Sequence, residues 1–128
     1  MNINILLPHK EIFDKNLASS VSITVKNNMQ YSIYKKNIRV FGVNCIDPIY
    51  PEHFVGIKDP INFFASKNKN LAKKMIEFIQ KDSCRHQLIE IHNRPYLFNL
   101  VKNKLPNYPI SLFFHNDPYT MMGSKSVK

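Results

Sequence analysis

The stretch that decides the predicted fold spans residues 88–118 and reads LIEIHNRPYLFNLVKNKLPNYPISLFFHNDP. It begins with an apolar, β-branched run at 88–91, typical of a buried strand, and a second such run covers 110–114. Between the two runs, Pro95 suits the first turn of a helix and Pro106 marks its end. The apolar residues at helical spacing between these prolines are Leu97, Leu100, Val101 and Leu105. The stretch therefore predicts a strand, a helix and a second, parallel strand.

Towards the N-terminus, apolar and mixed segments alternate in the same way. Residues 2–7 and 38–43 are short apolar or β-branched runs and predict two further strands. Residues 66–81 predict a helix, because Ser66 can cap it and its apolar residues fall on one face. Short strands that alternate with helices predict an α/β domain in which a mostly parallel sheet is covered by helices on both faces.

Three segments are less regular. Residues 8–18 are polar and predict a loop. Residues 19–36 alternate at Val21, Ile23 and Val25 as a strand does, but the length of the segment favours a helix. Residues 44–65 predict an irregular connection with at most one short helical turn, because prolines and glycine interrupt them. These breaking residues are Pro48, Pro51, Gly56 and Pro60.

Length and composition point to a single globular domain. The chain has 128 residues, of which 44% are hydrophobic, so it can bury a core and does not have a disordered composition. No apolar run approaches the length of a membrane span, and the N-terminus lacks the pattern of a secretory signal. Cys45 and Cys84 form no Cys-x-x-Cys pair, which predicts reduced, structural thiols. We therefore expect a cytoplasmic protein.

The formal net charge of +9 admits two interpretations. It can indicate an anionic partner, such as an anionic membrane surface or RNA. It can also reflect a lysine-rich composition with solvated helix faces, since the chain has 15 lysines and 3 arginines. Specific readers of nucleic acid favour arginine for its planar fork of donors, so we expect no specific nucleic-acid partner. The basic stretch at 67–81 fits the exposed face of the predicted helix.

Two predicted strands are followed by the same short motif. Residues 92–96 read His-Asn-Arg-Pro-Tyr, and residues 115–119 read His-Asn-Asp-Pro-Tyr. Because the carboxyl ends of parallel strands meet at one edge of a sheet, we expect both His-Asn pairs to lie side by side. Imidazole and carboxamide groups suit ligands rich in hydroxyls or phosphates, since both donate and accept hydrogen bonds. The alternative is that each motif is only a capping turn between a strand and a helix.

The loop after the first strand is a second candidate site, and other signatures of chemistry are missing. Asp14 in that loop could act as a base toward a substrate hydroxyl, although a solvated charged loop is the plainer interpretation. His92 and His115 are 23 residues apart with no further ligand at metal spacing, so we expect no metal. The chain has neither a glycine-rich phosphate loop nor a Gly-x-Ser-x-Gly motif.

With these motifs, the chain resembles the N-terminal half of family-4-like glycosyltransferases. These are retaining enzymes of GT-B type, built of two Rossmann-like domains. The resemblance is carried by the runs at 5–8, 18–20, 89–95 and 112–118, and it is specific only over 86–118. It implies a Rossmann-like three-layer sandwich over residues 1–118, followed by a polar tail at 119–128.

The resemblance also implies a function and a set of site residues. This half would bind the acceptor, a cell-envelope glycan or a lipid-linked hydroxyl, and would close over a nucleotide-sugar held mainly by another half. His115 would lie near the donor sugar and its diphosphate, and Asp14 would meet the acceptor. The residues expected to bind substrate are Asn16, Ser19, His92, Asn93, Asn116 and Asp117. No cofactor beyond the nucleotide-sugar is implied.

Two departures from the family pattern matter. Family members usually have a glycine pair where this chain has Ala18-Ser19-Ser20, and side chains there limit the approach of a diphosphate. The second, donor-binding domain is missing, so we expect a fragment that is inactive alone, or one chain of a split enzyme. The main alternative is a non-enzymatic basic module that binds anionic membrane or RNA. A flavodoxin-like signalling domain fits less well, because acidic residues do not cluster after the first strand.

Overall fold

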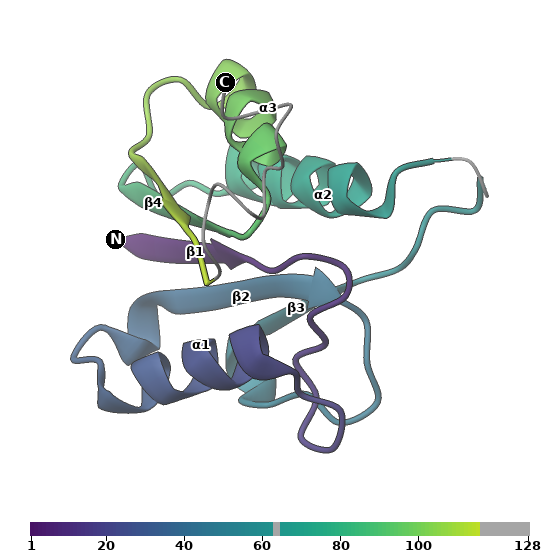
Figure 1. The fold of residues 1–128 in the computed structure, drawn as a ribbon. Coiled ribbons are helices and arrows are strands. Elements are labelled where there is room, and N and C mark those ends of the chain that lie inside the picture. The colour runs from purple at the N-terminus through teal and green to yellow at the C-terminus, as the bar shows by residue number, and fades with distance from the viewer. Residues whose placement is uncertain (63–64, 116–128) are drawn as a thin grey trace.

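A computed structural model describes residues 1–62 and 65–115 of the chain (Figure 1). These residues form a parallel five-stranded sheet with the strand order β3-β2-β1-β4-β5, together with three α-helices. The strands are β1 (Asn2–Leu6), β2 (Ile38–Val43), β3 (Phe54–Ile57), β4 (Gln87–His92) and β5 (Ile110–Phe113). The helices are α1 (Ser20–Tyr31), α2 (Lys67–Lys81) and α3 (Pro95–Lys104). The predicted α/β class, a Rossmann-like sandwich, is confirmed.

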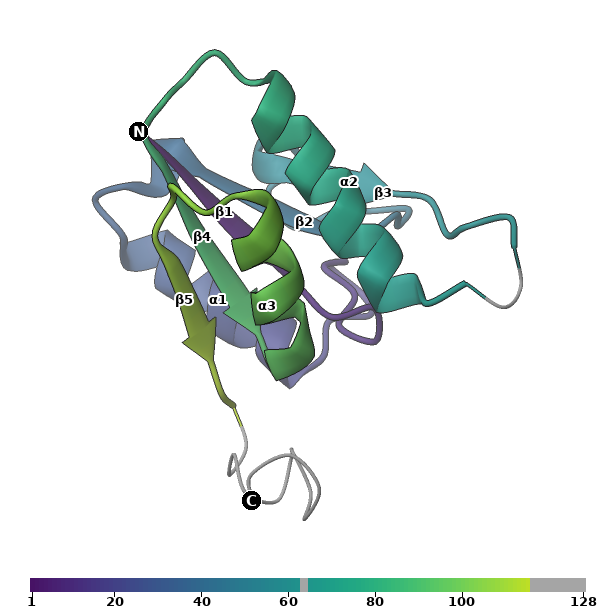
Figure 2. The same ribbon diagram turned by 90° about the horizontal axis from the view of Figure 1, so that it is seen from above.

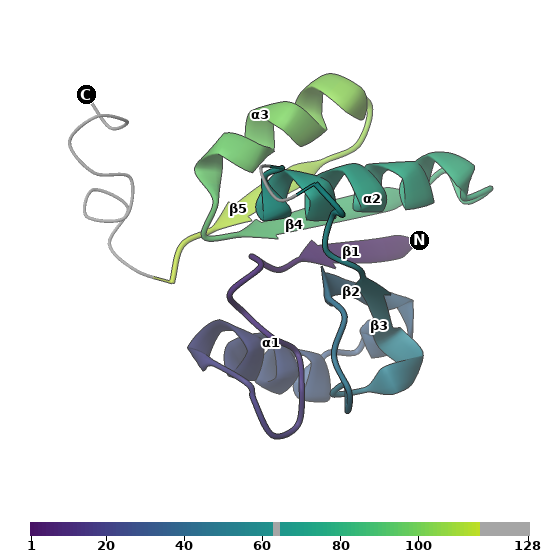
Figure 3. The same cartoon turned by 90° about the vertical axis from the view of Figure 1, so that its right-hand side faces the viewer.

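The strand order reverses at β1, which is the central strand of the sheet. β1 pairs with β2 on one side and with β4 on the other, so that Leu6 registers with both Phe41 and Ile91. Helix α1 covers one face of the sheet, and α2 and α3 cover the opposite face (Figure 3). In sheets wound this way, ligands bind beyond the carboxyl ends of the strands, next to the reversal.

The core between the sheet and helices α2 and α3 is formed by alternate residues of the strands. Ile89 and Ile91 of β4 are buried there against Leu71 and Met75 of α2 and Leu97 of α3. Burial of each such side chain stabilises the fold by roughly 1.5–3 kcal/mol. The opposite side of α2 is exposed and carries its lysines, as the amphipathic pattern predicted. The predicted cap is confirmed, since Ser66 Oγ accepts a hydrogen bond from the Lys69 backbone N–H.

The opposite face is covered partly by loops. Val21, Val25 and Met29 of α1 pack against β1 and β2. No α-helix joins β2 to β3, and the described residues 44–53 run over the sheet instead and contribute the buried Ile49. The loop after β1 packs beside this connection, because Phe13 is buried and its ring stacks on that of Phe54 with centroids 5.8 Å apart.

Two of the less regular segments differ from their predictions. Residues 19–36 form α1 and then a short 3₁₀ helix at Lys35–Asn37, so the helical interpretation is correct over its first part. Residues 44–65, predicted to be irregular with at most one short helical turn, contain the short 3₁₀ helix Pro51–His53. They also contain the edge strand β3, which was not predicted. β3 is only 4 residues long and is interrupted by Gly56, so its apolar pattern is too short to mark a strand.

A polar network crosses the strands on the side of α2. Arg39 on β2 forms a 2.8 Å ion pair with Asp82, the residue after α2. Its guanidinium also donates to Asn4 Oδ1 on β1, and Asn4 Nδ2 in turn donates to Gln87 Oε1 on β4 at 2.8 Å. The Asp82 pKa is lowered by the backbone N–H of Cys84, helped by Gln87 and Arg39. The network therefore satisfies Asn4 and Gln87, which are buried polar groups at the centre of the sheet.

Candidate functional site

The two His-Asn motifs meet at the carboxyl edge of the sheet. β4 and β5 lie side by side and end in the same direction (Figure 2), β4 at His92 and β5 at Phe113. Nδ1 of His92 lies 2.7 Å from Nε2 of His115, within hydrogen-bonding distance. The planes of the two rings are inclined by 27°, and their centroids lie 5.0 Å apart. The expectation that the two turns lie side by side at one edge is therefore confirmed for the histidines.

Asn93 fixes the relative position of the two turns. Its backbone has a φ of 56°, a left-handed conformation that asparagine tolerates better than most residues. This bend lets its N–H donate to the Phe113 carbonyl at 2.8 Å, while its side-chain Oδ1 accepts the His115 N–H at 2.8 Å. Asn93, predicted to bind substrate, is buried, and its two hydrogen bonds connect the turn after β4 to the end of β5.

A third polar group extends the histidine pair. Glu90 lies two residues before His92 on β4, and its Oε2 is 3.4 Å from Nε2 of His92. His92 is only 3% exposed and its ring stacks on the Phe113 ring, with centroids 5.2 Å apart. The three polar side chains thus form a line from Glu90 through His92 to His115. Carboxylate–imidazole contacts of this kind fix which ring nitrogen carries the proton.

The electrostatics of the site favour a neutral imidazole at His115. Burial lowers the pKa of His115, and the neighbouring His92 lowers it further, while Glu11 acts in the opposite direction. Two imidazolium rings in contact would repel each other, so a positive charge on both rings at once is disfavoured. At neutral pH the neutral His115 ring can therefore both donate and accept hydrogen bonds, which suits a ligand with hydroxyl groups.

A cavity of about 230 Å³ opens beside Glu90 and His92, between α1 and the β4–β5 half of the sheet. Helix α1 contributes Asn28 to its wall, and the half-exposed Phe113 closes the side next to β5. Its other lining residues are Ile3, Ile5, Val25, Met29, Ser32, Tyr34 and Ile38. The cavity is mostly apolar with a few polar groups on its wall, the usual character of a small-molecule site.

Asp14 has a structural role. It is 2% exposed, and each of its carboxylate oxygens accepts a backbone N–H, Oδ1 from Asn16 at 2.8 Å and Oδ2 from Asp47 at 3.0 Å. These bonds lower its pKa and keep it ionised. Oδ1 thus holds the loop after β1 in its turn and Oδ2 joins that loop to the β2–β3 connection, so we leave the predicted base Asp14 out of the site.

Among the described residues, Ser19 and Asn16 of the first loop form no hydrogen bond with His92 or His115. Ser19 Oγ donates to the Glu11 carboxylate, which also accepts the Val21 N–H at 3.0 Å and so caps the start of α1. Asn16 is exposed and lines a separate cavity of about 490 Å³ together with Tyr50. Asn116 and Asp117, which follow His115, lie outside the described residues.

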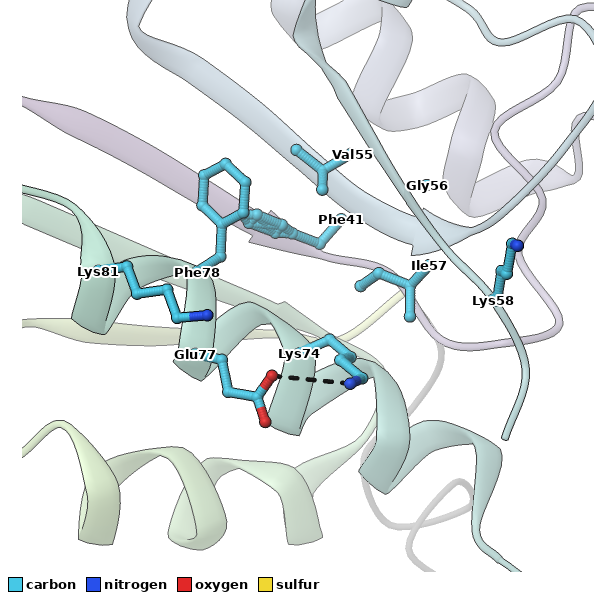
Figure 4. A pocket seen from close by; sticks show the side chains of 9 residues that line it. All are labelled: Phe41, Val55, Gly56, Ile57, Lys58, Lys74, Glu77, Phe78 and Lys81. Carbon is cyan, nitrogen blue, oxygen red and sulfur yellow. Dashed lines mark ion pairs between the residues drawn. The ribbon is translucent and has the colours of Figure 1, made fainter. Parts of the chain in front are cut away.

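A groove of about 330 Å³ lies elsewhere, between β3 and α2 (Figure 4). Its apolar lining includes Phe78, which is 42% exposed, with Phe41, Val55 and Ile57 beneath. Lysines surround it; they are Lys58, Lys74 and Lys81. Only one of them, Lys74, has an ion pair among the described residues, 3.7 Å from Glu77.

Sequence reasoning missed two residues near the site, Glu90 and Glu11. Glu90 could have been found, because residues two apart on a strand face the same way and His92 was already a candidate. Glu11 carried no such signal, since its contact with α1 depends on the path of the loop. No group of three or more metal-ligating side chains occurs among the residues that the structure describes. None of the described helices is long and apolar enough to cross a membrane.

Comparison with protein-family models, with curated proteins and with solved structures gives no match.

Proposed function

We propose that the chain is the acceptor-side half of a retaining glycosyltransferase of GT-B type. The observation that supports this most is the contact between His92 and His115 at the carboxyl edge of the sheet. The His-Asn-x-Pro-Tyr motifs carried the sequence resemblance, and the two histidines lie together where a wound parallel sheet binds its ligands. The lowered pKa of His115 favours a neutral ring, which can donate and accept hydrogen bonds as a hydroxyl-rich ligand requires.

In this proposal a sugar moves from a nucleotide-sugar to a hydroxyl of a cell-envelope glycan or lipid-linked acceptor. The acceptor oxygen forms a bond to the anomeric carbon, and the bond from that carbon to the diphosphate oxygen breaks. The hydroxyl proton leaves with the departing diphosphate. His115 would hydrogen-bond the donor sugar or its diphosphate, and fixed donors of this kind stabilise charge that develops on a leaving group.

The proposal includes a second nucleotide-binding half that holds the donor, encoded on the same or a separate polypeptide. The described residues that would face it are those at the carboxyl edge, His92 and His115 among them. Most stabilisation of the leaving diphosphate would come from that half, so residues 1–128 alone should transfer sugar slowly or not at all. Because nucleotide-sugars are made inside the cell, the proposed location is cytoplasmic, on the inner face of the membrane where the acceptor is lipid-linked.

The test is a transfer assay on the protein encoded by the complete reading frame that contains codons 1–128. Membrane extract supplies the acceptors, and a panel of nucleotide-sugars with a labelled sugar supplies the donors. We expect transfer by the unmodified protein and a reduction of about 100-fold in His115→Ala. His86→Ala is the matched control, because His86 is exposed and precedes β4 at the opposite edge of the sheet. A folded protein that transfers no sugar, or equal rates for both variants, would contradict the proposal.

A second candidate function is a basic module that binds anionic membrane or RNA without catalysis. The groove beside α2 favours the membrane form, because lysines there surround the partly exposed Phe78. Cosedimentation with vesicles, with and without an anionic lipid, tests it at several salt concentrations, and a labelled RNA provides the other arm. Binding that needs anionic lipid, weakens with salt and is lost in Lys58→Glu/Lys81→Glu supports it. Absent or salt-insensitive binding to both partners removes this candidate.

A further inference from the structure

Glu90, His92 and His115 form one hydrogen-bonded line, and its geometry determines where the protons lie. A carboxylate only accepts hydrogen bonds, so the 3.4 Å contact with Glu90 Oε2 requires the proton of His92 to be on Nε2. A neutral His92 then has a bare Nδ1. The 2.7 Å contact between Nδ1 of His92 and Nε2 of His115 therefore requires His115 to be the donor, through its Nε2–H.

The same reasoning leaves Nδ1 of His115 as the unprotonated nitrogen. Among the hydrogen bonds between described residues, none uses this atom. The backbone of His115 is held separately, by the bond from its N–H to Asn93 Oδ1 at 2.8 Å. One contact of the ring and one of the backbone thus hold His115, while the Nδ1 lone pair is left to accept a hydrogen bond from a ligand.

We infer that Glu90 is a positioning residue that, through His92, fixes the tautomer of His115 and makes its Nδ1 an acceptor for a ligand hydroxyl. The tautomer follows from the contacts of two neutral rings; the role of the ligand hydroxyl, a sugar O–H, rests on the proposed function. Glu90 is partly exposed beside the cavity that His92 also lines, so it reaches the pair from the cavity side. Carboxylates hold catalytic imidazoles in one tautomer by the same arrangement in other sites.

The test reads the tautomers directly by nitrogen NMR of the ¹⁵N-labelled chain 1–128 at neutral pH. We expect Nε2 of both rings to show the shift of a protonated nitrogen and Nδ1 of both rings that of a bare one. In Glu90→Leu we expect the pair also to populate the reverse arrangement, in which His92 donates from Nδ1. The nitrogen shifts of both rings should then move toward the average of the protonated and bare values. Glu90→Gln keeps an acceptor oxygen and should retain most of the original pattern.

Glu77→Leu is the matched control, because Glu77 is an exposed carboxylate on α2 and lies on the other side of the sheet. It should leave both rings unchanged. A protonated Nδ1 on His115 in the unmodified chain, or identical shifts in Glu90→Leu, would overturn the inference. The NMR result does not depend on sugar transfer, so it can hold even if the proposed function fails.

The consequence for catalysis is read in the transfer assay of the complete protein. We expect Glu90→Leu to lower kcat about tenfold with little change in KM, as is usual when a group that orients a functional side chain is lost. Glu90→Gln should recover most of that loss. An unchanged kcat in Glu90→Leu, measured on a protein that does transfer sugar, would contradict the positioning role while leaving the proposed function in place.

Discussion

The side chain of Asn93 accepts the backbone N–H of His115 at 2.8 Å, and this bond joins the turn after β4 to the end of β5. The two residues are 22 positions apart in the chain, yet the backbone N–H of Asn93 also donates to the Phe113 carbonyl. The left-handed bend at Asn93 is what makes both bonds possible at once. The position of the His115 ring therefore depends on a residue in the other motif.

Replacement of Asn93 should disturb both stability and the histidine pair. Asn93→Ala removes the acceptor for the His115 N–H and puts alanine in a left-handed conformation, so we expect a loss of about 1–3 kcal/mol in the free energy of unfolding. Asn93→Gly should lose less, because glycine adopts this conformation without strain. Urea denaturation measures both values. Equal losses for the two variants would show that the backbone conformation is unimportant.

The His115 ring should make the fold less stable in mild acid. Its pKa is lowered in the folded chain, so the unfolded chain binds more protons as the pH falls below the ordinary histidine value. The contribution of His115 to the free energy of unfolding is complete above the ordinary histidine pKa and is lost as the pH falls through the pKa of the folded chain. We expect the free energy of unfolding to decrease on acidification, with a smaller decrease in His115→Gln. In His86→Gln the free energy of unfolding should depend on pH as steeply as in the unmodified chain. An equally steep dependence in His115→Gln would contradict this prediction.

The ion pair between Arg39 and Asp82 should contribute stability at neutral pH. Asp82→Asn removes a charge that accepts bonds from Arg39 and the Cys84 N–H, and we expect it to cost about 1–3 kcal/mol. Because the Asp82 pKa is lowered on folding, its contribution is present above the ordinary aspartate value and disappears as the pH falls through the folded pKa. Denaturation at several pH values checks this; the difference from the unmodified chain should shrink in acid. Glu77→Gln, an exposed carboxylate, should show little effect at any pH.

The contact of α2 with the sheet should depend on the packing of Met75. This side chain is fully buried in the core beneath α2, so Met75→Ala should lower the free energy of unfolding by about 2–5 kcal/mol. Met75→Leu keeps the volume and should cost less than about 1.5 kcal/mol. A thermal or urea transition for each variant provides the measurement. A negligible effect of Met75→Ala would show that α2 is not held to the sheet as described.

The sequence predicted the features that depend on local pattern. The helix after Ser66 and the strand, helix and strand between residues 88 and 113 have clear periodicity, and both predictions are confirmed. The edge strand β3 was missed, because 4 residues with a central glycine give almost no alternation to detect. Its strand character comes from pairing with β2, a tertiary contact that no local signal records.

The candidate site was predictable only in part, for the same reason. The meeting of the His92 and His115 turns follows from the rule that parallel strands end at one edge. The role of Asp14 could not be predicted, because its partner Asp47 is 33 residues away in a connection without regular structure. From sequence alone, a carboxylate in a polar loop cannot be told from a catalytic base, because the N–H groups that donate hydrogen bonds to it are not known.

The central position of β1 has a consequence for folding during synthesis. β1 emerges from the ribosome first, but one of its two neighbours, β4, lies more than 80 residues later in the chain. Until β4 has been made, β1 has one unpaired edge, and exposed strand edges pair readily with other chains. Nascent chains that stall between β3 and β4 should therefore be the species that chaperones engage most.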